Sequence, residues 1–217
     1  MTGKAYRTYV FDCDGVVLDS NRIKTEAFRV AAAPYGDEAA QALVDYHVAN
    51  GGISRFVKFR HFLDELLPPD ATGPGIDQLL DSYADAVADG LRQCRIADGL
   101  AALRESTPDA TWLIVSGGSQ DELRSVFAER GIDTMFDGGI FGSPDTKDDI
   151  LARELASSNI ARPALFIGDS VYDHRAASGA GLDFVFATYW TEVRDWPDFV
   201  ARNDLDTIAC LSELMEG

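Results

Sequence analysis

The chain has 217 residues, of which 46% are hydrophobic and 25% are charged, and its formal net charge is −17 at pH 7. This composition indicates a globular protein of one or two domains and excludes a disordered acidic chain. The excess of acids excludes unaided binding to nucleic acid or to an anionic membrane, because both partners require basic patches. No apolar run approaches the roughly 18–20 residues that a membrane-spanning helix needs.

The first predicted element is a strand over Tyr6–Phe11, an apolar run that stops at Asp12. Residues 19–92 then show only helical patterns, over Arg22–Ala33, Glu38–Val48, Arg55–Leu67 and Ile76–Arg92. A helical stretch of about 70 residues is too long for a loop. We therefore predict a helical cap domain, residues 19–92, inserted into a core domain formed by residues 1–18 and 93–217.

Strand and helix alternate through the rest of the chain. Apolar runs predict strands over Trp112–Val115, Gly139–Phe141, Ala164–Ile167 and Asp183–Ala187. Helical patterns lie over Gln120–Arg130, Lys147–Ser157 and Asp173–Ser178, with a last helix over Asp206–Met215. Continuous apolar strands are typical of a sheet covered on both faces, so we predict a doubly wound α/β fold with a mainly parallel sheet.

Two acids, Asp12 and Asp14, directly follow the first strand, and Gly15 comes after them. Residues two apart in an extended chain point the same way about 7 Å apart, so these carboxylates repel unless they share a proton or bind a cation. A strand-end turn with surface acids is the alternative. The apolar strand before the pair favours a place at the carboxyl edge of a parallel sheet, where ligands bind.

Ser116 and Gly117 follow the second strand, and Ser119 with Glu122 has the spacing of a capping box. Glycine N–H groups at such a turn can bind an anion, although an ordinary glycine-rich turn explains the pattern better when it is taken alone. Lys147 begins a helix, where the helix dipole disfavours a cation. An anion to hold would explain this position, and a solvated lysine is the alternative.

Asp169 ends an apolar strand as Asp12 does, and Asp173 follows at the start of a helix, where an N-cap role would also explain it. All of these groups should meet on one rim of the sheet. Carboxylates there predict a Mg²⁺ site, and Ser116, the glycine N–H groups and Lys147 predict a phosphate clamp. Together they predict phosphoryl transfer through an aspartyl-phosphate.

The four motifs in this order resemble those of the haloacid dehalogenase-like (HAD) superfamily with an α-helical C1-type cap, a group that includes phosphatases, phosphoglycolate phosphatases and β-phosphoglucomutases. The resemblance covers essentially the whole chain. It implies that Asp12 is the nucleophile and that Asp14 is the general acid and base. It also implies a Mg²⁺ site at Asp12, the backbone carbonyl of Asp14, Asp169 and Asp173, and a phosphate site at Ser116, Gly117 and Lys147.

The resemblance further implies a cytoplasmic Mg²⁺-dependent phosphatase, a monomer or homodimer, that acts on a small phosphorylated metabolite such as a sugar phosphate. The superfamily's dehalogenases and phosphonate hydrolases lack the second acid, so Asp14 counts against both. A phosphotransferase or sugar-phosphate mutase on the same core is the alternative, although the His that mutases carry after the first motif has no clear counterpart. A non-catalytic binding module ranks lower because the motif acids and Lys147 are intact.

Arg55 and Lys58 belong to the only dense basic cluster of the chain, directly after the turn at Asn50-Gly51-Gly52. We predict that both bind the part of the substrate that is not transferred. A solvated helix face explains the cluster equally well. The three cysteines, Cys13, Cys94 and Cys210, show neither a disulfide nor a zinc pattern, which agrees with the cytoplasm.

Overall fold

The computed structural model describes residues 5–215 and contains a six-stranded sheet in the order β3-β2-β1-β4-β5-β6. Every pairing between neighbouring strands is parallel. The strands are β1 (Thr8–Phe11), β2 (Thr111–Ser119), β3 (Gly139–Ser143), β4 (Ala164–Gly168), β5 (Asp183–Ala187) and β6 (Asp206–Ile208). The strand that carries the first acidic motif therefore lies in the middle of the sheet, between the strands that carry the second and the fourth.

Strand β1 is buried on both faces because alternate side chains enter two different apolar clusters. Tyr9 and Phe11 pack into the larger cluster, where Phe11 contacts Trp112 with ring centroids 4.7 Å apart. Val10 enters the smaller cluster on the other face together with Phe166. This alternation explains why Tyr9, Val10 and Phe11 are apolar in succession rather than at every second position.

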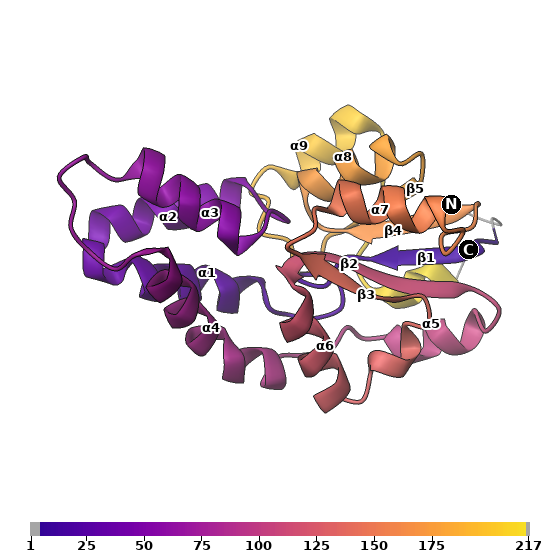
Figure 1. The fold of residues 1–217 in the computed structure, drawn as a ribbon. Helices are drawn as coiled ribbons and strands as arrows, with labels where there is room; N and C mark the ends of the chain where they lie inside the picture. The colour runs from indigo at the N-terminus through magenta and orange to yellow at the C-terminus, as the bar shows by residue number, and fades with distance from the viewer. Residues whose placement is uncertain (1–4, 216–217) are drawn as a thin grey trace.

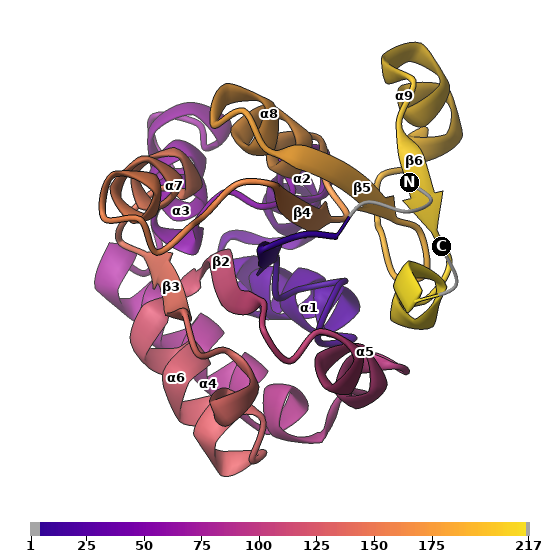
Figure 2. The same cartoon turned by 90° about the vertical axis from the view of Figure 1, so that its right-hand side faces the viewer.

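Helices cover both faces of the sheet (Figure 2). On the face of the larger cluster lie α5 (Leu100–Ser106) and α6 (Gln120–Glu129), and on the other face lie α7 (Lys147–Ala156) and α8 (Val171–Gly179). This arrangement confirms the predicted doubly wound α/β fold. None of the helices in residues 5–215 combines the length and the apolar character needed to cross a lipid bilayer.

The inserted helices stand beyond the carboxyl ends of the strands (Figure 1). They are α1 (Asn21–Ala32), α2 (Asp37–Ala49), α3 (Arg55–His61), which continues as a π-helical turn (Phe62–Leu66), and α4 (Ile76–Gln93). Phe28 is at their centre, with its ring 4.6 Å from Tyr83 and 5.1 Å from Phe59. The insertion of helices agrees with the predicted fold class, while the division into domains 1–18 with 93–217 and 19–92 stays a prediction; we call residues 19–92 the cap.

The predicted last helix over 206–215 is wrong. Residues 206–208 form strand β6, with Ile208 buried and paired with Ala187 of β5, and only Leu211–Met215 is helical, as a short 3₁₀ segment. The helix lies earlier, as α9 (Trp196–Asn203), with Pro197 in its first turn. The pairing of β6 with the sheet outweighs the helical spacing of the apolar residues in this segment.

Candidate active site

The chain leaves the sheet at Asp12, directly after β1, and the Asp12 carboxylate is held in place there. Its Oδ1 accepts hydrogen bonds from the backbone N–H of Cys13 at 2.7 Å and from Lys147 Nζ at 2.9 Å. Asp12 is only 3% exposed. Burial raises the pKa of this carboxyl to about 7, although the nearby Lys147 opposes the shift.

Lys147 connects two of the predicted acids. It is the first residue of α7, as expected, and its Nζ lies 2.5 Å from Asp173 Oδ1 as well as 2.9 Å from Asp12 Oδ1. Burial disfavours the charge of Lys147, but the two carboxylates more than compensate and raise its pKa. The alternative of a solvated lysine is therefore wrong: the side chain is fully buried at the end of β1.

Asp173 lies in the capping box of α8 but not at the N-cap. Ser170 is the N-cap residue, and Asp173 Oδ2 accepts from the Ser170 hydroxyl at 2.7 Å and from its N–H at 3.1 Å. The other oxygen, Oδ1, accepts from Lys147. Asp173 thus fixes both the start of α8 and the position of Lys147.

Three carboxylates meet at this edge of the sheet and fit a divalent cation. Asp12, Asp169 and Asp173 are buried, and each offers an oxygen within 4.8 Å of the others. Burial, and then the charges of Asp12 and Asp173, raise the pKa of Asp169 well above its usual value. An all-oxygen set of acids whose negative charges disfavour one another suits a hard cation such as Mg²⁺.

Gly15 allows this close approach. Its φ of +75° is in the left-handed region, and a Cβ on it would lie 2.1 Å from Asp169 Oδ2. The same carboxylate oxygen accepts a hydrogen bond of 2.8 Å from Asn21, the first residue of α1. Only glycine fits between the first acidic motif and the fourth.

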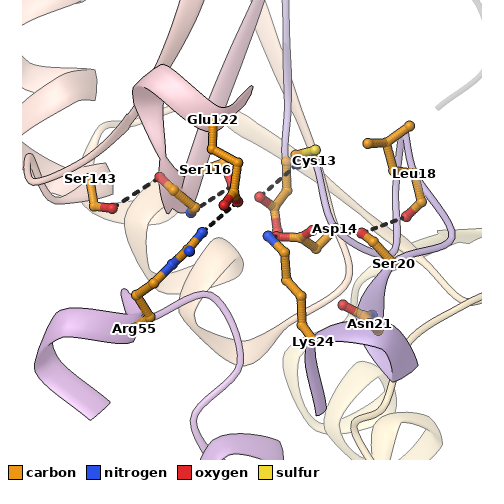
Figure 3. A network of polar contacts seen from close by, with 12 residues as sticks. Cys13, Asp14, Leu18, Ser20, Asn21, Lys24, Arg55, Ser116, Glu122 and Ser143 are labelled. Carbon is orange, nitrogen blue, oxygen red and sulfur yellow. Dashed lines mark hydrogen bonds and ion pairs between the residues drawn. The ribbon is translucent and has the colours of Figure 1, made fainter. Parts of the chain in front are cut away.

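Asp14 points away from the carboxylate cluster and toward the cap. Its Oδ2 lies 2.6 Å from Lys24 Nζ, and its Oδ1 accepts a 2.6 Å hydrogen bond from the Ser20 hydroxyl (Figure 3). Burial would raise the pKa of this carboxyl, but Lys24 and Ser20 outweigh it and lower the pKa. The structure therefore separates the two acids of the motif: Asp12 faces Lys147, and Asp14 faces Lys24.

Sequence reasoning missed Lys24, although the helix pattern contained a signal. Asn21, Lys24 and Phe28 are spaced i, i+3 and i+7 on α1 and therefore share one face. Lys24 is only 6% exposed, and all three residues line the cleft described below. A lysine in the buried stripe of an amphipathic helix needs a carboxylate partner, and Asp14 is that partner.

The second motif lies where the cap touches the core. Ser116 is fully buried within β2, and its Oγ accepts a 3.0 Å hydrogen bond from the N–H of Gly118. A Cβ on Gly117 would lie 2.2 Å from the carbonyl oxygen of Gly52 in the cap. The glycine at 117 therefore lets the cap main chain pack directly against the core beside the acids.

The cap residues predicted to bind substrate have different surroundings. Arg55 is buried, and its NH2 lies 2.5 Å from Glu122 Oε1 on α6 (Figure 3). Its guanidinium lies 4.4 Å from the centre of the Tyr83 ring. Lys58 is 2% exposed, and its Nζ lies 2.7 Å from His47 Nδ1. The alternative of a solvated helix face is therefore wrong for both side chains.

A cleft with about 650 Å³ of empty space, its mouth included, lies between the strand ends and the cap. The charged groups that line it include the core residues Asp12, Asp14 and Asp169 and the cap residues Lys24, Arg55 and Lys58. Gly117 also lines it, whereas Ser116, Lys147 and Asp173 lie buried beneath its floor. The fold thus brings the residues of the four motifs together at one cleft, and residues of all four cap helices, α1 to α4, line its other side.

Comparison with known proteins agrees with this architecture. The sequence profile of the haloacid dehalogenase-like hydrolases matches residues 6–181. Among curated proteins, none is significantly similar in sequence to the chain.

Solved structures with the same fold include a predicted phosphoglycolate phosphatase from Haemophilus somnus 129pt, with a TM-score of 0.75 at 16% identity over 99% of both chains. A predicted phosphatase from Clostridium acetobutylicum has a TM-score of 0.74 at 19% identity over 98% of both chains. The protein tyrosine kinase A of Mycobacterium tuberculosis has a TM-score of 0.68 at 22% identity, over 99% of this chain and 98% of its own. These similarities concern the fold, which is shared by proteins with different names. The profile match covers most of the chain, and the protein therefore belongs to the haloacid dehalogenase-like hydrolase family.

Proposed function

We propose that this hydrolase is a Mg²⁺-dependent phosphatase that acts on a small phosphorylated metabolite through an aspartyl-phosphate on Asp12. The observation that carries the proposal is the position of the Asp12 carboxylate, which ends the central strand, lines the cleft and is fixed on one side by Lys147. The second acid, Asp14, lines the same cleft and lies two residues further along. A nucleophile and a proton carrier are thus available side by side.

In the first step, a carboxylate oxygen of Asp12 would attack phosphorus while the bond to the leaving oxygen breaks. The negative charge of the bound phosphate ester would oppose the lowering of the Asp14 pKa by Lys24, so that Asp14 takes up a proton when the ester binds. Asp14 would give this proton to the leaving oxygen, so that the product leaves as an alcohol. In the second step, a water molecule would attack the phosphorus of the aspartyl-phosphate, and Asp14 would take the proton of the water. Asp12 is released as a carboxylate together with inorganic phosphate.

The other motif residues would hold the phosphoryl group and offset its charge. Lys147 and the groups at Ser116 and Gly117 would bind the phosphoryl oxygens. The carboxylates of Asp12, Asp169 and Asp173, with the backbone carbonyl of Asp14, would hold Mg²⁺, which when bound offsets the negative charge of the acids and of the phosphoryl group. Lys24 would keep Asp14 at the cap side of the cleft through their 2.6 Å contact.

The size of the cleft supports a small substrate. Only about 60 Å³ inside the cleft is open to the centre of a water molecule, so a folded protein domain cannot enter. A sugar phosphate is one candidate for the small substrate. The three cysteines are free, which suits the cytoplasm that we propose as the site of action.

The test is phosphate release from p-nitrophenyl phosphate and from a panel of sugar phosphates and phosphorylated acids, with Mg²⁺ and with EDTA. We expect release that depends on the metal and falls by at least about 10³-fold in Asp12→Asn, since the nucleophile is lost. Asp109→Asn is the control, because Asp109 is an exposed carboxylate outside the cleft. Release that persists in EDTA, or full activity of Asp12→Asn, would show that the mechanism is wrong.

A second measurement separates hydrolysis from transfer to another molecule. Reactions run in ¹⁸O-labelled water should place the label in the released phosphate. Appearance of the phosphoryl group on a second sugar position, without labelled phosphate, would favour the mutase or phosphotransferase alternative instead.

A further inference from the structure

Lys58 brings a buried ammonium group to the cleft. The side chain comes from α3 and is almost entirely buried, with Nζ 2.7 Å from the neutral partner His47 and 5.5 Å from the centre of the Phe28 ring. Within residues 5–215, no ion pair joins Lys58 to an acid. An isolated charge in such a place is costly unless something compensates for it.

The two neighbouring cations of the cap show that this is an exception. Lys24 lies 2.6 Å from Asp14, and Arg55 lies 2.5 Å from Glu122. Each of them therefore has its counter-charge on the core side of the cleft. Lys58 lines the same cleft, and of its three lining cations it alone has no ion pair with an acid of residues 5–215.

The charges around Lys58 also leave its ammonium group without sufficient compensation. Burial, and then the charges of Lys24 and Lys147, lower the pKa of Lys58 to about 7, and the charges of Asp14 and Glu192 do not compensate. Burial and the adjacent Lys58 also lower the pKa of His47 to about 2, so the imidazole is neutral. When Lys58 is protonated it donates to His47 Nδ1, which leaves the imidazole proton on Nε2. The pair therefore has spare donors and no acceptor of matching charge.

We propose that Lys58, held in position by His47, forms a subsite for a carboxylate of the substrate, so that the substrate is the phosphate ester of a small acid rather than of a neutral sugar or alcohol. The proposal rests on the proposed function, because the ester phosphate is assigned to the Asp12 end of the cleft. The Lys58 ammonium has three N–H groups and uses one of them on His47 Nδ1, so two remain for the oxygens of a carboxylate. A second phosphate would need more donors and more positive charge than this single ammonium has.

The test compares esters that differ only in the acid group. Two such pairs are 6-phosphogluconate with glucitol 6-phosphate and 3-phosphoglycerate with glycerol 3-phosphate, in which a hydroxymethyl group replaces the carboxylate. Fructose 1,6-bisphosphate with fructose 6-phosphate tests a second phosphate in the same way. Dissociation constants are measured by calorimetry in the Asp12→Asn background with Mg²⁺, so that binding does not depend on turnover, and hydrolysis is measured with the unmutated protein.

We expect the acid of at least one pair to bind roughly 10- to 100-fold more tightly than its alcohol, the effect of one charge-assisted hydrogen bond. Lys58→Met should abolish this preference, and Lys58→Arg should keep part of it. Lys58→Gln serves as a second replacement should methionine disturb the packing of the cap. Arg60→Met is the matched control, because Arg60 is on the same helix but exposed, and the preference should survive in it.

Equal binding within every pair, or no binding of either member, would overturn the proposal, and so would a preference that survives Lys58→Met or disappears in Arg60→Met. A stronger preference for the bisphosphate would assign the subsite to phosphate and overturn the carboxylate. Tight binding of the acids without any hydrolysis would keep the subsite and refute the phosphatase. Hydrolysis without a preference for acids would support the phosphatase and refute the carboxylate subsite.

Discussion

The two walls of the cleft treat charge in opposite ways. On the core wall, Asp12, Lys147 and Asp173 form one continuous buried network in which each charge contacts its opposite. On the cap wall, Lys24 and Arg55 find their carboxylates only across the cleft, on Asp14 and Glu122. The network of Asp12, Lys147 and Asp173 thus lies within the core alone, whereas Lys24 and Arg55 of the cap wall depend on the core for their counter-charges. Chemistry that is the same for every substrate belongs on the first wall, and selection and closure belong on the second.

Replacement of Lys147 should have the largest effect on the core wall, because Lys147 contacts both Asp12 and Asp173. We expect Lys147→Met to lower kcat by roughly 10²–10³-fold, as for loss of one charged donor to the reacting group. It should also lower the free energy of unfolding by roughly 3–5 kcal/mol, because two buried carboxylates lose their cation. Chemical unfolding with and without Mg²⁺ checks this, since the metal should stabilise the variant more than the unmutated protein. An unchanged stability would show that the network is not needed for folding.

The contact between the walls can be tested at Gly117. In Gly117→Ala, the new Cβ would lie 2.2 Å from the carbonyl oxygen of Gly52, so the cap must move away from the core. We expect kcat/KM to fall by roughly tenfold to a hundredfold, the effect of misplacing groups by about 1 Å. Gly179→Ala in α8 is the control, because no atom lies within 4 Å of a Cβ there. Equal activity of the two variants would mean that cap and core need not touch in this way.

The dependence of the cap on the core can be measured at Arg55 and Glu122. A double-mutant cycle with Arg55→Met and Glu122→Gln should give a coupling of roughly 1–3 kcal/mol in unfolding free energy, because the pair is largely buried. The pair Arg92–Glu129 also joins α4 of the cap to α6, but both side chains are nearly half exposed. Its cycle should give less than about 1 kcal/mol. Similar values for the two pairs would remove the distinction between the buried and exposed links.

The last expected effect concerns the response of the cap wall to acid. The pKa of His47 is lowered to about 2 by burial and by Lys58 and Lys24, with Asp14 opposing them, whereas an unfolded histidine has a pKa near 6.5. Between these values the unfolded chain binds one more proton, so stability falls as the pH falls below about 6.5. From pH 7 to pH 5 the unmutated protein should lose roughly 2 kcal/mol more than His47→Gln. Urea unfolding at both pH values checks this, and parallel losses would show that His47 titrates normally.

The core wall could be predicted from the sequence because its residues follow apolar strands directly. Asp12 and Asp169 each come at the end of such a strand, and parallel strands end at one edge of a sheet. Lys147 was found at the first position of its helix behind Thr146, whose hydroxyl does accept from the N–H of Asp149. Where a residue directly follows a strand, the local sequence is therefore enough to predict its place at the edge of the sheet.

The cap wall could not be predicted to the same extent because its contacts join residues far apart in the chain. Glu122 was expected to form a capping box with Ser119, but Ser119 makes no side-chain cap, and Glu122 binds Arg55, 67 residues away. Nothing local to either residue indicates this pair. The same holds for strand β6, which a neighbouring strand stabilises against the helical pattern of its own sequence.

The main-chain contact between Gly52 and Gly117 limits which substitutions can change the substrate specificity of this protein. At that point one main chain lies against another, so no side chain can be shortened to enlarge the cleft. The opposite side of the cleft is built of side chains, among them Phe28, Lys58 and Tyr83. Selection for a new substrate, in nature or in a laboratory library, should therefore act at those three positions and leave the two glycines untouched.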